Sequence, residues 1–84
     1  MCNQDDILVK VREVCKASFA VDPQKVNLET AARDIPGWDS VGQLSLGSEL
    51  EEVFHISLEV DEMMALKNVR DVVRVIQTKL AAQT

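Results

Sequence analysis

Apolar residues recur at helical spacing in three long stretches of this chain, and each stretch predicts an amphipathic helix. The first covers residues 5–20, where apolar positions are separated by three and four residues. The others cover residues 40–55 and 69–82. Asn68 stands directly before the last stretch, where its side-chain oxygen suits a helix N-terminus. The pattern of apolar positions therefore predicts a predominantly helical protein.

Residues 21–38 form a long connection between the first two predicted helices. Pro23 and Pro36 prevent a continuous helix through it, although a short helical turn near residues 29–33 fits the pattern. A loop of this length is unusual in a small domain. Four apolar side chains would pin it over the core: Val26, Leu28, Ile35 and Trp38.

The segment before the last helix first alternates apolar and polar residues and then regains helical spacing. We interpret residues 56–60 as an extended loop held by its apolar side chains, because a lone strand would have no partner. Residues 61–66 would form a short helix. Its inward side would carry Met63, Met64 and Leu66.

These elements sum to an all-α fold, a four-helix bundle of three longer helices and one short helix with a long first loop. The 84 residues suffice for a single domain, residues 1–84. The hydrophobic fraction is 46%, but only three residues are aromatic, so the core must be aliphatic. A core this small leaves little room for a deep pocket, which argues against an enzyme.

The second predicted helix has two apolar faces. Its inner side would carry Leu46, Leu50, Val53 and Phe54, with Gly47 near the edge. Val41 and Leu44 fall on the opposite half, beside the carboxylates of Glu51 and Glu52. Two apolar side chains beside acidic groups suggest a surface that contacts a partner, with charge around a hydrophobic centre.

Two glycines interrupt the second predicted helix. Gly42 and Gly47 each cost about 1 kcal/mol relative to alanine in a helix interior. They imply either a close backbone approach or a tolerated weakness, and the sequence leaves both interpretations open.

Acidic residues dominate the charge of this protein. The net charge is −5 and the pI about 4.7, which excludes nucleic acid and an anionic membrane surface as partners. Eight acidic residues and no lysine or arginine lie between Asp34 and Glu62. This stretch is either a solvated surface or a patch that steers basic partner proteins by long-range attraction.

The chain shows no targeting or metal-binding pattern. Residues 1–6 lack the features of a signal peptide, and no segment has transmembrane length. Cys2 and Cys15 are too few for a disulfide framework and lack metal-site spacing, and Cys15 fits a buried thiol. We expect a cytoplasmic monomer without a metal.

The start of the second helix carries the sharpest chemical signal. The loop marked by Pro36 and Gly37 ends at Asp39 and Ser40, and either side chain suits the N-cap. The Ser40 hydroxyl would stand at the positive end of a helix dipole, where a phosphate ester is favoured. The position alone is also explained by an unmodified cap.

Nucleophilic catalysis by Ser40 is excluded by the predicted geometry. The single histidine, His55, lies at the far end of the same helix, about 22 Å away at 1.5 Å per residue. No glycine-rich phosphate loop, metal-ligand cluster or nucleophile elbow is present. Glu51 and Glu52 diverge on a helix and do not form a catalytic pair. The sequence therefore predicts a protein that is not an enzyme.

Asp39-Ser40-Val41 resembles the Asp-Ser-Leu signature of acyl carrier proteins, at the right place in the order of helices. The surrounding pattern of Gly37-Trp38-Asp39-Ser40, followed by Leu44, Leu46, Leu50-Glu51-Glu52 and Phe54, is similar to small freestanding carriers of dedicated pathways. The likeness covers about residues 5–80.

The resemblance implies a function for Ser40. This serine would carry 4′-phosphopantetheine, transferred from coenzyme A by a phosphopantetheinyl transferase, with Asp39 beside it. The thiol of the arm would hold an acyl group as a thioester and deliver it to loading and processing enzymes with basic docking surfaces. The residues expected to dock those partners are Val41, Leu44, Glu51, Glu52, Asp61, Glu62 and Met63.

Three departures from the family pattern point away from general fatty-acid synthesis. Val41 replaces the usual leucine, Ser45 stands where many fatty-acid carriers have a glutamate, and two glycines, Gly42 and Gly47, interrupt the helix. We therefore expect a dedicated polyketide or other natural-product pathway. A freestanding peptidyl (aminoacyl) carrier and an unmodified helical interaction module remain as alternatives.

Overall fold

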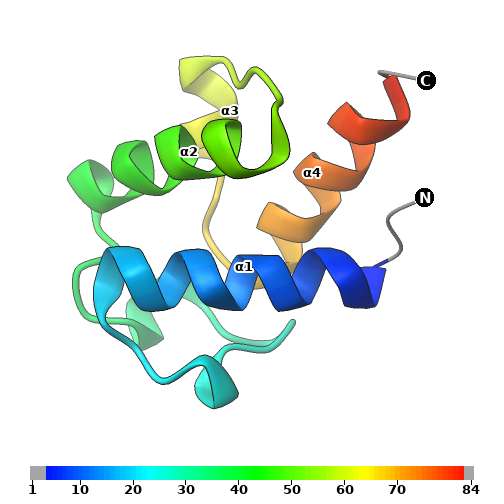
Figure 1. The fold of residues 1–84 in the computed structure, drawn as a ribbon. Coiled ribbons are helices and arrows are strands. Elements are labelled where there is room, and N and C mark those ends of the chain that lie inside the picture. Colours follow the sequence, from blue (N-terminus) through cyan, green and yellow to red (C-terminus); the bar gives the residue numbers. More distant parts are fainter. Residues whose placement is uncertain (1–3, 83–84) are drawn as a thin grey trace.

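The computed structural model describes residues 4–82, which contain four α-helices and two short 3₁₀ helices (Figure 1). The α-helices are α1 (Gln4–Phe19), α2 (Ser40–Phe54), α3 (Val60–Met64) and α4 (Val69–Ala82). The 3₁₀ helices η1 (Pro23–Lys25) and η2 (Ala32–Asp34) lie between α1 and α2. The predicted all-α architecture is confirmed, and the three long helices have the predicted bounds to within one residue.

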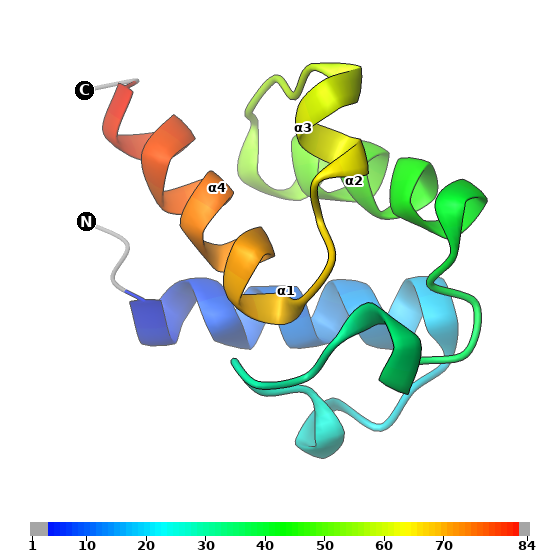
Figure 2. The same cartoon turned by 180° about the vertical axis from the view of Figure 1, so that it is seen from behind.

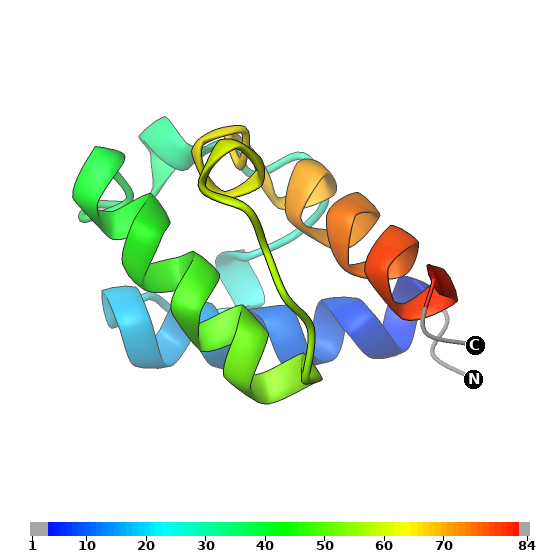
Figure 3. The same cartoon turned by 90° about the horizontal axis from the view of Figure 1, so that it is seen from above.

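Helix α1 is the base on which the other long helices pack. It contacts both α2 and α4, while α3 packs on α2. Viewed from above, α2 and α4 both run obliquely to α1, and the short α3 lies between the ends at which they begin (Figure 3). No helix within residues 4–82 is long and apolar enough to cross a membrane.

The core is aliphatic, as its composition requires. Helical periodicity places one apolar stripe of each long helix inward, and burial of these stripes stabilises helices that would be marginal alone. The side chains with less than 2% of their surface exposed are Ile7, Val11, Cys15, Val26, Leu46, Leu50, Leu66, Val69, Val72, Val73 and Ile76.

The long connection is pinned at both ends of its path. Val26 is fully buried, and its carbonyl accepts a hydrogen bond from Arg12 Nε of α1 at 2.7 Å. Further on, the Ala32 N–H donates to the Lys67 carbonyl, and the Val69 N–H donates to the Thr30 carbonyl, both at 2.9 Å. The connection thus runs behind α1 and meets the start of α4 (Figure 2).

The expected anchors and turn of this connection are confirmed in part. Val26, Ile35 and Trp38 are buried, whereas Leu28 is only half-buried. The turn expected near residues 29–33 lies at η2, and η1 was not predicted. Asp22 starts η1 by accepting a hydrogen bond from the Gln24 N–H at 2.9 Å, a local bond that proline at the first helical position favours.

Both glycines of α2 lie where another group approaches closely, which decides between the two interpretations left open above. A Cβ at position 42 would overlap the Gly37 carbonyl oxygen. A Cβ at position 47 would lie 2.6 Å from Met63 Cγ. The glycines therefore permit the loop and α3 to pack directly on the α2 backbone.

Three apolar side chains expected to face inward are exposed instead. Val53 is 36% exposed because it faces the outer edge of the contact between α1 and α2. Val60 is 63% exposed because α3 begins at this residue, one position earlier than expected, and ends the alternation of the extended segment. Met64 is 40% exposed because only Met63 and Leu66 fit against the core.

Candidate functional site

Ser40 is the first residue of α2, and Asp39 is its N-cap. The Asp39 carboxylate accepts a hydrogen bond from the Gly42 N–H at 2.8 Å, and its carbonyl accepts from the Gln43 N–H at 2.7 Å. The capping role that the sequence left open between the two residues therefore belongs to Asp39. Ser40 is exposed, and its hydroxyl is not needed to cap the helix.

The loop before Ser40 is held firmly, so the hydroxyl has a defined place. Trp38 is buried and stacks on Phe19 with ring centres 5.8 Å apart and an interplanar angle of 11°. Gly37 has φ +93°, a left-handed conformation that glycine adopts without strain. Its carbonyl fits against Gly42 of α2. These contacts fix where α2 begins.

The charge around Ser40 suits a phosphate ester. The first turn of α2 contains no acidic residue, and its N–H groups carry the positive end of the helix dipole. The carboxylate of Asp39, one residue earlier, is engaged by the Gly42 N–H. An exposed hydroxyl on a fixed helix start therefore fits the attachment of a phosphate-linked group.

The outer face of α2 beside Ser40 is apolar and acidic, as predicted. Val41 is 73% exposed and Leu44 is 41% exposed. Glu52 is exposed farther along the same face. Glu51 is only half-exposed because its carboxylate accepts a hydrogen bond from the Leu58 N–H at 2.8 Å, and so holds the segment between α2 and α3.

Helix α3 continues this surface, but with different residues from those expected. Met63 is 8% exposed and covers Gly47, so the expectation that it belongs to a docking surface is wrong. Asp61 is exposed, as expected. The apolar side chains that α3 does expose are Val60 and Met64. Helical periodicity did not identify them, because a helix of five residues has too few positions to define a face.

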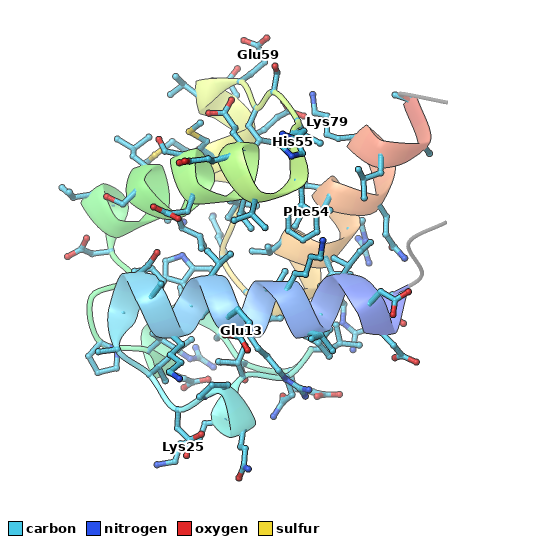
Figure 4. The ribbon with its side chains drawn as sticks, in the orientation of Figure 1. Glu13, Lys25, Phe54, His55, Glu59 and Lys79 are labelled. Carbon is cyan, nitrogen blue, oxygen red and sulfur yellow. The ribbon has the colours of Figure 1, made fainter. Side chains whose placement is uncertain are left out.

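Glu62 has a structural role that the sequence did not reveal. Its carboxylate accepts a hydrogen bond from the Glu59 N–H at 2.9 Å and pairs with Lys79 Nζ of α4 at 2.9 Å. Both interactions lower the pKa of Glu62, and the hydrogen bond from the Glu59 N–H is the largest single cause. Figure 4 shows Lys79 reaching from α4 toward the level of α3.

Other reactive side chains lie away from Ser40 or are buried. His55 ends α2 in the left-handed conformation, with φ 56°, at the far end from Ser40. Burial raises the pKa of the Cys15 thiol to about 11, so that it is protonated at neutral pH. Cys2 lies outside the described residues. Within residues 4–82, no three His, Cys, Asp or Glu side chains are grouped to hold a metal.

Comparisons with known proteins agree with this site. The family model described as phosphopantetheine attachment site matches residues 8–76. The acyl carrier protein of Thermosynechococcus vestitus is 36% identical over 80 residues, covering 95% of this chain and 99% of that protein. The acyl carrier protein of Phytoplasma australiense is 33% identical, covering 89% of this chain and 99% of that protein.

A solved structure shares the fold. The solution structure of the holo acyl carrier protein from Geobacter metallireducens superimposes with a TM-score of 0.78 and 31% identity, covering 92% of this chain and 88% of that chain. The chain belongs to the acyl carrier protein family, whose members bear a covalently attached 4′-phosphopantetheine. It is therefore a carrier protein and not an enzyme.

Proposed function

We propose that Ser40 is the attachment point of 4′-phosphopantetheine and that the protein carries an acyl group as a thioester on this arm. The proposal rests mainly on one observation: Ser40 is exposed at the start of α2, while the capping role belongs to Asp39. The arm supplies a thiol that forms the thioester. The protein supplies a fixed position for that arm and a surface that partners bind.

The carrier leaves the chemistry of attachment to its partner. In the attachment step the Ser40 oxygen would bond to the phosphorus that bears pantetheine, the pyrophosphate bond of coenzyme A would break, and adenosine 3′,5′-bisphosphate would leave. The Ser40 proton must pass to a base, and His55 lies fifteen residues farther along α2, about 22 Å away at the rise of a helix. Asp39 is a positioning residue, because its hydrogen bond to Gly42 defines the helix start. A phosphopantetheinyl transferase must therefore provide the base.

We also propose that the outer face of α2 and α3 docks the partner enzymes. Its apolar centre consists of Val41 and Leu44 with Val60 and Met64, all exposed. The surrounding charge comes from Glu52 and Asp61, with a weaker contribution from the engaged carboxylates of Glu51 and Glu62. An apolar centre with an acidic rim is complementary to a partner with a basic rim.

Two residues of this face are the basis for our proposal of a pathway. Val41 is smaller than the leucine of the family signature, and Ser45 is an exposed hydroxyl where many fatty-acid carriers have a carboxylate. A face altered at these positions favours partners of a dedicated polyketide or other natural-product pathway.

We further propose that the carrier acts as a cytoplasmic monomer. Sedimentation at micromolar concentration tests the oligomeric state.

Attachment is tested by incubating the unmodified protein with coenzyme A and a broad-specificity transferase. Intact mass should show one added arm on the wild type and none on Ser40→Ala. Ser48→Ala is the matched control, because Ser48 is an exposed serine on the same helix, and it should be modified fully. An unmodified wild type, or a modified Ser40→Ala, contradicts the proposal.

Docking is tested by charge reversal at Glu52. Glu52→Lys should raise the transferase KM about three- to tenfold at low salt, since it replaces attraction to a basic rim by repulsion. Glu49→Lys makes the same charge change on the side of α2 opposite Ser40, and should leave KM unchanged. Equal effects of the two substitutions would exclude a specific role of the outer face.

The carried group is tested directly on the native protein. Trapping the loaded carrier in its host and weighing it distinguishes an acyl thioester, which we propose, from an aminoacyl thioester. A carrier that is active with Ser40→Ala in place would instead be an unmodified interaction module.

A further inference from the structure

A groove of about 260 Å³ lies between α1 and α2. Its walls are formed by Lys10, Glu13, Val14 and Ala17 of α1 and by Glu49 and Val53 of α2. Figure 4 shows Glu13 on α1 and Phe54 at the end of α2, the two helices that border the groove. No residue of the proposed docking face lines this groove.

The floor of the groove is apolar and open to solvent. Val53 is a β-branched apolar residue, yet it is 36% exposed where α2 borders the groove. A single exposed valine on a surface carries no meaning. Here Val53 faces Val14 and Ala17 across a concave surface, which an apolar side chain from another protein would fill.

The rim of the groove selects for positive charge. Glu13 on α1 and Glu49 on α2 stand on opposite walls, both exposed, and within residues 4–82 neither carboxylate forms an ion pair. Lys10, also on the rim, is directed toward Phe54, with Nζ 5.8 Å from the centre of the ring. With Glu13 and Glu49 against the single cation of Lys10, the rim carries more negative than positive charge, which favours a partner with basic side chains.

The groove and the proposed docking face lie on different sides of α2. Because an α-helix has about 3.6 residues per turn, Leu44 lies roughly one turn beyond Ser40 on the same side of the helix. By the same periodicity Glu49 lies on the side opposite Ser40, and Val53 lies one turn beyond Glu49. A protein bound in the groove therefore leaves Ser40 and the outer face accessible to an enzyme.

We infer that this groove docks a basic amphipathic helix of a partner protein, whose apolar side chain covers Val53 while its lysine or arginine side chains pair with Glu13 and Glu49. Such a partner holds the carrier while other enzymes act on the arm. The inference does not require that Ser40 be modified, so Ser40→Ala should bind the same helix with unchanged affinity.

The probe is a synthetic helical peptide about 15 residues long, with leucine at every third or fourth position and lysine elsewhere on that face. A matched peptide has glutamate in place of each lysine. Titration into ¹⁵N-labelled protein should shift the amide resonances of residues 10–17 and 49–53 with the basic peptide only. Raising the salt concentration to about 0.5 M should weaken this binding, because the pairs are partly exposed.

Variants assign the binding to the groove. Glu13→Gln with Glu49→Gln should lower the affinity about tenfold, the combined effect of two partly screened ion pairs. Val53→Gln should also lower it, while Glu52→Gln, on the outer face, should not. Circular dichroism checks that each variant is folded. Resonance shifts centred on Val41 and Leu44, or a double variant that binds like the wild type, would overturn the inference.

Discussion

At the scale of single residues, two glycines determine how α2 packs, because they have no side chain. Gly42 is in contact with the backbone of Gly37, and Gly47 is in contact with the side chain of Met63. Both clearances are too small for a methyl group, but they differ in what would have to move. The backbone of the loop is fixed, whereas methionine has three rotatable bonds and adapts to a changed neighbour.

We therefore predict that Gly42→Ala is much more damaging than Gly47→Ala. Overlap with the Gly37 carbonyl should lower the free energy of unfolding by about 2–3 kcal/mol, a typical cost of overpacking. At position 47 the gain in helix propensity, about 1 kcal/mol, offsets most of the displacement of Met63. Urea denaturation of both variants measures the difference, and equal losses would contradict it.

The residue scale also shows what the sequence predicts well. Capping chemistry located the start of α2 at Asp39 and Ser40, because a polar oxygen next to a turn is a local signal. Which of Met63 and Met64 is buried could not be predicted from a local signal. It depends on Gly47 lying under one of them, a contact between residues sixteen positions apart in the chain.

At the scale of elements, α3 is a short helix held by its neighbours and not by its own length. It spans only five residues, fewer than an isolated helix needs to be stable in water. Three contacts hold it and the segments that flank it. Glu51 binds the Leu58 N–H, Glu62 pairs with Lys79, and Gln43 Nε2 of α2 donates to the Leu66 carbonyl at 2.7 Å.

The Glu62 contacts predict a defined dependence of stability on pH. Because folding lowers the pKa of Glu62 below its ordinary value of 4.5, its contribution is fully present above that value and is lost as the pH falls through the lower folded pKa. Glu62→Gln should therefore be less stable than the wild type at pH 7 and should approach it at acid pH, once the folded carboxyl is protonated.

Urea denaturation of both proteins from pH 7 to about pH 3 measures this convergence. Lys79→Met tests the contribution of the ion pair. In that background the loss of stability caused by Glu62→Gln should be smaller but still present, since the Glu59 N–H remains. A difference that does not change with pH would show that the carboxylate charge of Glu62 contributes nothing.

Elements differ in how far the sequence predicts them, for physical reasons. The three long helices have enough turns for their apolar stripes to define a face, and their bounds were predicted closely. Residues 56–60 were correctly predicted as extended, but the position of Val60 was wrong because it begins α3. Val53 was also assigned wrongly, since its exposure depends on how α1 crosses α2.

At the scale of the whole molecule, one thiol reports on the integrity of the core. Cys15 is fully buried on α1, and burial raises its pKa to about 11. Only the thiolate reacts with alkylating agents, so both the protonation and the packing of Cys15 protect it.

We predict that iodoacetamide at pH 8 leaves Cys15 unmodified in the folded protein and modifies it fully in urea. Mass analysis of the peptide that contains Cys15 provides the measurement. Gly42→Ala, if it loosens the fold as predicted above, should react at an intermediate rate. Rapid labelling of Cys15 in the native wild type would show that the core opens more readily than its burial indicates.

The stacked pair of Trp38 and Phe19 gives this carrier its own optical signal. Trp38 is the single tryptophan of the chain, it is 5% exposed, and it precedes Ser40 by two residues. Within the described residues its Nε1 has no hydrogen-bond partner, so the indole lies in an apolar environment, and its fluorescence should be blue-shifted. Emission from unlabelled protein would thus follow both unfolding and the arrival of any group at the neighbouring serine.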